Sequence, residues 1–303
     1  MKSNFKGISL ADLCSWFGIS RQAYYQSKSR ILRELVEQEI LLSAVKGIRE
    51  NHKRLGGRKL FGKLKGFMSD HQIKMGRDAF FDFLRDNGLL VRKRKRYHVT
   101  TNSNHWMRKY PNLIREIEPM GPNHVWVSDI TYWKTKGGHY YISFITDAYS
   151  RKIVGYHVAK TMEAIESVAA LKVALKGLNV QASALVHHSD RGSQYCSAKY
   201  VELLKKNNVQ ISMTENGDPL ENAIAERLNG IIKGEYLVDY QVNSLTEAKR
   251  ILEAVVGLYN EERPHSSVSN LTPSAVHQGE LCQEIKRLWK NYYQKREECE
   301  TVK

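Results

Sequence analysis

The sequence predicts a mixed α/β domain preceded by an all-α, strongly basic region. Three runs rich in Val, Ile and aromatic residues, at 125–133, 140–148 and 152–160, are joined by short turns and are typical of antiparallel strands. Helix-like and strand-like segments alternate after them, which indicates helices packed on a sheet. The first 120 residues carry 25 Lys and Arg against 11 Asp and Glu, within a net charge of +15. This excess is typical of a region that binds a polyanion.

The first elements are predicted to form a helix, a tight turn and a second helix over residues 8–28. Gly18 permits the turn, and Ser20 is a suitable N-cap for the second helix. In a helix-turn-helix this second helix would face DNA, and its candidate contacts are Arg21, Gln22 and Tyr24. An ordinary helical hairpin explains the same pattern equally well.

A second group of helices is predicted at 34–51, 58–69 and 77–87. The last of these carries a cluster of Phe residues, which we interpret as core and not as a base-stacking surface. The group suggests another helix-turn-helix, with candidate DNA contacts at Arg58, Lys59 and Arg77.

Five consecutive basic residues follow this group, at Arg92, Lys93, Arg94, Lys95 and Arg96. Such a run in a linker-like position is expected to contact phosphates without reading base sequence, although a solvated run of charges is the alternative. Residues 98–122 read as an extended linker.

The rest of the chain continues the alternating pattern. Helices are expected at 162–178, 197–207, 220–238 and 245–260, strands at 184–190 and 210–214, a turn at Arg263-Pro-His265, and a helical tail at 281–299.

Three acidic residues on separate elements form the candidate catalytic and metal-binding site. Asp129 lies within the first strand, Asp190 follows a later strand, and Glu226 lies inside the helix predicted at 220–238. Carboxylate oxygens are the ligands that Mg²⁺ prefers, and two such ions can hold both the attacking and the leaving oxygen of a phosphoryl displacement. Asp147 competes for this role, but it precedes a turn, where aspartate is locally favoured, and is interpreted as structural.

Other polar residues lie close to these acids in the sequence. Asn222 and Lys233 share a helix face with Glu226 by three- and four-residue spacing and, with Arg191, are candidate DNA contacts. Glu215 and Glu221 are expected to be solvated. His187 and His188 point to opposite faces of their strand, so at most one of them faces the site. We interpret them as buried, hydrogen-bonded histidines and not as metal ligands.

The order of these motifs resembles a known family. The stretches that carry the likeness are W-V-S-D-I-T-Y, I-T-D-A-Y-S-R-K-I-V-G-Y, H-S-D-R-G-S-Q-Y, E-N-A-I-A-E-R and Y-N-E-E-R-P-H-S-S-V-S-N-L-T-P-S-A-V. Asp129, Asp190 and Glu226, with 35 residues between the last two, resemble the DDE signature of integrases and transposases. The chain is similar to the second-frame (OrfB) transposase of the IS-three group of insertion sequences over about residues 54–276. One departure is Glu221, where the family usually carries Asp.

The resemblance implies a fold and a division of the chain. The fold would be a ribonuclease-H-like integrase core behind helix-turn-helix DNA-binding regions. The expected segments are 1–32 (first helix-turn-helix), 33–97 (second, with the basic run), 98–122 (linker), 123–240 (catalytic core) and 241–303 (C-terminal helices completing the core, and tail).

The resemblance also implies an activity. The expected protein binds the terminal inverted repeats of its element and cleaves and joins DNA strands with two Mg²⁺ ions, which Mn²⁺ could replace. Its expected partners are double-stranded DNA of the transposon ends and target, further copies of itself, and an upstream-frame protein (OrfA) or a fusion with it. A nuclease with the same core and a catalytically inactive helix-turn-helix regulator remain alternatives.

Several other classes are excluded by what the sequence lacks. The four cysteines show no zinc-ligand spacing, no G-x-S-x-G elbow is present, and no Walker-type phosphate loop occurs. No apolar run approaches a membrane span, and the N-terminus has no signal-peptide core. We therefore expect no membrane partner and a location in the bacterial cytoplasm, associated with the nucleoid.

Overall fold

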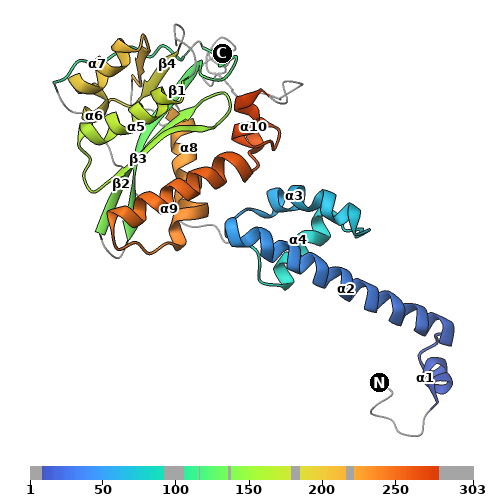
Figure 1. The fold of residues 1–303 in the computed structure, drawn as a ribbon. Coiled ribbons are helices and arrows are strands. Elements are labelled where there is room, and N and C mark those ends of the chain that lie inside the picture. Colours follow the sequence, from blue (N-terminus) through green and yellow to red (C-terminus); the bar gives the residue numbers. More distant parts are fainter. Residues whose placement is uncertain are drawn as a thin grey trace, which may run out of the picture. The chain divides into compact units, whose positions relative to one another are not determined.

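A computed structural model describes residues 9–91, 106–115, 117–135, 138–178, 185–215 and 222–279. Contacts between residues divide the chain into two compact units. The first comprises Met1–Asn51 and Gly56–Leu90, and the second comprises His52–Leu55 and Val91–Lys303. Figure 1 shows the elements of both.

The first unit is helical. Its helices are α1 (Leu10–Trp16), α2 (Arg21–Asn51), α3 (Gly57–Asp70) and α4 (Arg77–Asp86). The backbone N–H groups of Asp12 and Ala23 donate to the hydroxyls of Ser9 and Ser20, which therefore cap α1 and α2. The buried side chains that α2, α3 and α4 contribute include Leu41, Val45, Leu60, Leu64, Phe80, Phe83 and Leu84. The interpretation of the Phe cluster as core is confirmed for Phe80 and Phe83.

One continuous helix replaces the two that were expected at the start of this unit. α2 runs for 31 residues from Arg21 to Asn51, whereas separate helices were predicted to end near residue 28 and begin near residue 34. Residues 29–33 contain neither Gly nor Pro, so nothing in the backbone stops the helix there. The domain boundary expected between residues 32 and 33 falls inside α2.

The second unit is built on a mixed sheet. In the described residues its strands are β1 (Val125–Thr135), β2 (Gly138–Asp147), β3 (Ile153–Ala159), β4 (Val186–Ser189) and β5 (Gln210–Met213), in the spatial order β3-β2-β1-β4-β5. The first three strands are antiparallel neighbours, and β4 and β5 continue the sheet parallel to β1. The strands fall where the sequence predicted them.

Helices cover both faces of this sheet (Figure 1). α5 (Ala164–Lys176), α6 (Ser193–Cys196) and α7 (Ala198–Lys206) pack on one face, and α8 (Ala223–Ile231) and α9 (Leu245–Gly257) pack on the other.

The helix predicted at 220–238 is interrupted. After α8 the chain forms a π-helical turn at Ile232–Tyr236 and a 3₁₀ turn at Leu237–Asp239. A second π-helical turn at Leu258–Glu262 follows α9, and a 3₁₀ turn (Ser266–Val268) and α10 (Pro273–Gln278) complete the described chain.

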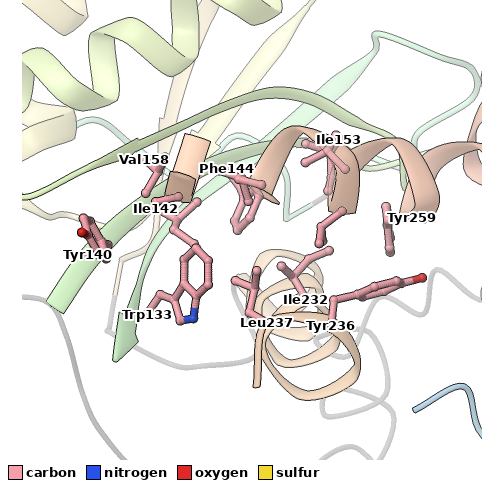
Figure 2. Packing of buried hydrophobic residues seen from close by; sticks show 14 of the residues in the cluster. Trp133, Tyr140, Ile142, Phe144, Ile153, Val158, Ile232, Tyr236, Leu237 and Tyr259 are labelled. Carbon is pink, nitrogen blue, oxygen red and sulfur yellow. The ribbon is translucent and has the colours of Figure 1, made fainter. Parts of the chain in front are cut away.

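Alternation along the strands assigns side chains to two hydrophobic layers. Trp133, Ile142 and Phe144 face Ile232 and Leu237 in the layer beneath α8 and α9 (Figure 2). The opposite layer, beneath α5 and α7, includes Trp126, Ile130, Leu171, Tyr200 and Leu204. Because Trp126 and Val127 point to opposite faces of β1, Asp129 lies on the same face as Val127, towards α8.

The contact between β3 and α5 depends on Gly155. A Cβ at this position would lie 2.5 Å from the carbonyl oxygen of Ala170 and 2.8 Å from the Cβ of Ala174. Neither atom can rotate away. We expect Gly155→Ala to lower the free energy of unfolding by about 1–3 kcal/mol or more, measured by urea denaturation. Gly257→Ala, in a helix with open space around it, is the matched control and should be neutral or slightly stabilising; equal behaviour of the two variants would contradict this account.

Part of the segment expected to be a linker packs on the second unit. Leu113, Ile114 and Ile117 join a cluster with Val125, Val127 and Ala225. The backbone N–H of Leu113 donates to Ser212 Oγ at 2.9 Å. Arg115 donates to Glu215 at 2.9 Å, so Glu215 is ion-paired and half-buried and not simply solvated, as had been expected.

The four residues His52–Leu55 belong to the second unit. His52 is buried, with Nδ1 3.1 Å from the hydroxyl of Tyr236 and Nε2 3.1 Å from Glu262 Oε2. Arg54 donates two hydrogen bonds of 2.7 Å to Asp239. Within the second unit these residues therefore contact the π-helical and 3₁₀ turns that follow α8 and α9.

Candidate active site

Two aspartates lie side by side on neighbouring parallel strands. Asp129 is the fifth residue of β1, and Asp190 directly follows the last residue of β4. Ser128 is the register partner of Ser189, so the two aspartates occupy the next position along strands about 4.8 Å apart. This is the carboxyl end of the parallel part of the sheet, where α/β proteins place their sites.

The surroundings of Asp129 combine burial with negative charge. Its Oδ1 accepts from the backbone N–H of Ile130 at 2.8 Å, and its Oδ2 accepts from Asn229 Nδ2 at 2.7 Å. Burial, together with the charges of Asp190 and Glu226, raises the pKa of Asp129 to about 7, although the two hydrogen bonds oppose the shift. The three acids therefore act on one another through their charges.

The third acid lies on α8, which is fixed against β1. Asn222, the N-cap residue of α8, donates to the carbonyl of Ser128 at 2.9 Å. One turn further on, Glu226 is exposed. Among the described residues no group of three His, Cys, Asp or Glu side chains is close enough to hold a metal ion. The structure thus brings Asp129 and Asp190 together and leaves the Glu226 side chain outside this pair.

Lys233 lies two turns beyond Glu226, in the π-helical turn. It is half-buried, with Nζ 4.4 Å from the ring centre of Tyr132 on β1. Burial lowers the pKa of Lys233, and the charge of Asp129 opposes this shift. The amine therefore lies over an aromatic ring and interacts with the charge of Asp129.

Asn229 is the site residue that the sequence analysis missed. It is buried, and its amide fixes the orientation of the Asp129 carboxylate. The signal was present in the sequence. Asn222, Glu226, Asn229 and Lys233 follow one another at spacings of four, three and four residues, which defines one face of a helix.

A buried polar network lies behind the aspartates. His187 Nε2 is 2.9 Å from both Ser128 Oγ and Tyr200 Oη. Burial lowers the pKa of His187 to about 3, so the imidazole is neutral. His188 is also buried, with Nδ1 2.8 Å from Ser212 Oγ. The prediction that these histidines are buried and hydrogen-bonded is confirmed.

Asp147 has the structural role expected of it. Its Oδ1 accepts from the backbone N–H and the hydroxyl of Ser150, both at 2.7 Å, and its Oδ2 accepts from the N–H of Asn123 at 2.7 Å. These bonds hold the turn that follows β2. Glu221 lies outside the described residues.

The remaining candidate residues are spread over the two units. Arg191 follows Asp190 and is half-buried. The candidates in the first unit lie in α2 (Arg21, Gln22, Tyr24), α3 (Arg58, Lys59) and α4 (Arg77, paired with Asp78 at 2.9 Å). The basic run Arg92–Arg96 lies outside the described residues, as does the helix predicted at 281–299. No helix in the described part of the chain has the length and apolarity that a membrane span needs.

Fold and site together define a ribonuclease-H-like integrase core, and comparison with known proteins gives the same class. Two family profiles described as "Integrase core domain" match residues 119–219 and 207–273. The chain is 33% identical over 271 residues to the insertion element IS600 uncharacterized 31 kDa protein of Shigella sonnei, covering 87% of this chain and 96% of that protein. It is 30% identical over 243 residues to the transposase for insertion sequence element IS904 of Lactococcus lactis, covering 80% and 94%. The catalytic core domain of HTLV-2 integrase, solved with magnesium, aligns at 22% identity with a TM-score of 0.42, covering 53% of this chain and 99% of that one.

The two relatives also identify the family to which the chain belongs. It belongs to the IS-three (IS3) family of insertion-sequence transposases, and it is a DDE transposase.

The raised pKa of Asp129 predicts a pH-dependent stability in metal-free protein. A carboxyl whose pKa is higher in the folded than in the unfolded state stabilises the fold at low pH, and this contribution is lost as pH rises through the folded value of about 7. With a chelator present, the melting temperature of the wild type should fall from about pH 5 to about pH 8 more than that of Asp129→Asn. Glu202→Gln, an exposed acid on α7, is the control; parallel curves for wild type and Asp129→Asn would refute the prediction.

Proposed function

We propose that this transposase binds the terminal inverted repeats of its element and cleaves and joins DNA strands by in-line phosphoryl transfer at Asp129, Asp190 and Glu226. The observation that carries the proposal is the pair of aspartates set side by side where the parallel pairing of β1 and β4 ends, with the charge of Glu226 acting on Asp129.

The chemistry of these side chains fits a divalent metal. Three carboxylates offer only oxygen ligands, which Mg²⁺ prefers, and a cation would relieve the repulsion that raises the pKa of Asp129. We assign two Mg²⁺ ions, with Mn²⁺ as a substitute, to Asp129, Asp190 and Glu226. When bound, such a pair activates the attacking oxygen and stabilises the leaving one.

The other residues of the site orient groups and neutralise charge. Asn229 holds the Asp129 carboxylate in one orientation, as residues behind a metal ligand commonly do. Asn222 holds the start of α8 against β1. The half-buried amine of Lys233 and the guanidinium of Arg191 supply positive charge for the phosphates of the DNA. The same site would serve strand cleavage, with water as nucleophile, and strand transfer, with a 3′-hydroxyl.

DNA binding is assigned to the basic region that precedes the catalytic core. Phosphate contacts by lysine and arginine supply most of the affinity, and helix residues that reach base edges supply specificity. Arg21, Gln22 and Tyr24 at the start of α2 are the candidate readers of the terminal repeat. Arg58, Lys59, Arg77 and the run Arg92–Arg96 are candidate phosphate contacts. An upstream-frame protein (OrfA) would be a further partner.

The proposal is tested with a labelled duplex that ends in the element's terminal repeat, incubated with purified protein and Mg²⁺. We expect nicked and joined products from the wild type, and binding without products from Glu226→Gln. Nicking without joining would favour a nuclease. Binding by a wild type that is as inert as the variant would favour a regulator.

A further inference from the structure

The middle of α2 is a helix without packing partners among the described residues. Every residue from Lys28 to Val36 is exposed, on all sides of the helix. This stretch nevertheless contains Ile31, Leu32, Leu35 and Val36, with 49%, 54%, 55% and 56% of their surface exposed. Four large apolar side chains gathered on one exposed helical segment indicate a surface that another protein covers.

The apolar residues continue into a seam along the helix. Tyr25, Lys28, Leu32, Leu35, Glu39 and Leu42 follow one another at alternating spacings of three and four residues, the pattern of the a and d positions of a coiled coil. Tyr25 is 56% exposed, Lys28 and Glu39 are exposed, and Leu42 is half-buried. The seam is therefore apolar, except for one basic and one acidic residue.

The seam is symmetric about its midpoint, between Arg33 and Glu34. Residues equally distant from that point have complementary chemistry, which gives the pairs Leu32 with Leu35, Ile31 with Val36, Lys28 with Glu39 and Tyr25 with Leu42. The other charges between residues 25 and 42 follow the same rule, because Arg30 and Arg33 precede the midpoint and Glu34 and Glu37 follow it.

We infer that α2 pairs with α2 of a second copy of this chain, antiparallel, around the midpoint between Arg33 and Glu34. A two-fold axis at that point sets leucine against leucine and places Lys28 of each copy beside Glu39 of the other, as a self-complementary interface requires. The basic residues 28–33 of each helix also lie along the acidic residues 34–39 of its partner. A parallel pair would set Lys28 against Lys28 and Glu39 against Glu39, and like charges in a seam are repulsive.

The length of the seam determines how strongly two copies are expected to associate. Residues 25–42 of an α-helix span about 27 Å, which is a small interface, so we expect a concentration-dependent dimer that DNA binding reinforces. A two-fold dimer presents two equivalent copies of the helical unit, which suits a protein that must hold two transposon ends. The inference does not rest on the assignment of the catalytic carboxylates.

Crosslinking of the full chain tests the orientation. A disulfide requires Cα atoms within about 7 Å, and in the proposed pair Lys28 meets Glu39, whereas the two copies of Lys28 lie about 16 Å apart along the axis. An equimolar mixture of Lys28→Cys and Glu39→Cys should form a 28–39 disulfide on oxidation, identified by mass spectrometry of the linked peptides. Each variant alone should form no 28–28 or 39–39 link. A 28–28 link, or none in the mixture, would overturn the inference.

Sedimentation analysis tests the interface itself. Leu32→Asp combined with Leu35→Asp should weaken self-association at least tenfold while the circular dichroism spectrum is kept, because both side chains are exposed within the described part of the chain. The control is Ile165→Asp, at an exposed apolar residue of α5, which should associate as the wild type does. Lys28→Glu and Glu39→Lys should each weaken association, and the double variant should restore it. A monomeric wild type would overturn the inference. So would equal weakening of self-association in the two single charge variants and in the double variant.

Discussion

Asp190→Asn is expected to lower the rate of strand joining by about 10³-fold or more while the affinity for terminal-repeat DNA is retained. A metal ion contributes several kcal/mol of charge stabilisation in a phosphoryl displacement, and each 1.36 kcal/mol changes a rate about tenfold. Asn keeps the shape of the side chain and its carbonyl oxygen, but removes the charge that holds the cation. Joined product per unit time, measured on a labelled transposon end, gives the result directly.

Two comparisons make this test specific. Asp129→Asn and Glu226→Gln should show losses of the same order, because the three acids are proposed to hold the metals as one group. Glu202→Gln, at an exposed acid on α7, should behave as the wild type. Full activity of Glu226→Gln beside inert Asp129→Asn and Asp190→Asn would reject Glu226 as the third ligand, and full activity of all three variants would reject the site.

Glu235→Ala should produce the largest loss of stability in the second unit. Arg263 is fully buried, and its Nε and Nη2 each donate to Glu235 at 2.8 Å. Removing the carboxylate would leave a guanidinium in the core without its main counter-charge, and breaking a buried ion pair in this way costs about 3–5 kcal/mol. Denaturation by urea, followed through the buried Trp126 and Trp133 of the same unit, measures the effect.

The loss of stability in Glu235→Ala is attributed to the unpaired charge of Arg263. Arg263→Met in the Glu235→Ala background removes the stranded charge, so the double variant should recover part of the lost free energy of unfolding. Asp78→Ala breaks an exposed pair with Arg77, whose contribution should be about 0–1 kcal/mol. If Glu235→Ala cost no more than Asp78→Ala, the Arg263–Glu235 pair would have no special role in stability.

Much of the catalytic unit could be predicted because its signals are local. The first three strands follow from β-branched and aromatic runs between turns, and their observed bounds differ from the predicted ones by few residues. The two aspartates stood out because each accompanies an apolar strand. The polar face of α8 was also readable, although Asn229 was overlooked on it.

Other features depended on partners distant in the sequence. The π-helical turns after α8 and α9 interrupt segments that read as regular helix, and they carry Tyr236 and Glu262, which contact His52. The segment at 98–122 looked like a linker because of its Thr and Asn residues and the Pro and Gly residues near its end. Within it, Leu113 and Ile114 nevertheless pack with buried residues of β1 and α8. The carboxylate that neutralises Arg263 lies 28 residues earlier in the chain.

By itself the sequence determined the strands and most helices of the catalytic unit, the polarity of their faces and the residue types able to bind a metal. Periodicity and side-chain chemistry are properties of the chain alone. The sequence also determined the symmetric pattern on α2. Only the tertiary structure decided that Asp129 and Asp190 become neighbours, that Asn229 holds one of them and that α2 is unbroken and exposed at its centre. These facts depend on strand order, burial and packing between segments that are distant in the sequence. The free energy of each contact depends on both partners, and the local sequence contains only one of them.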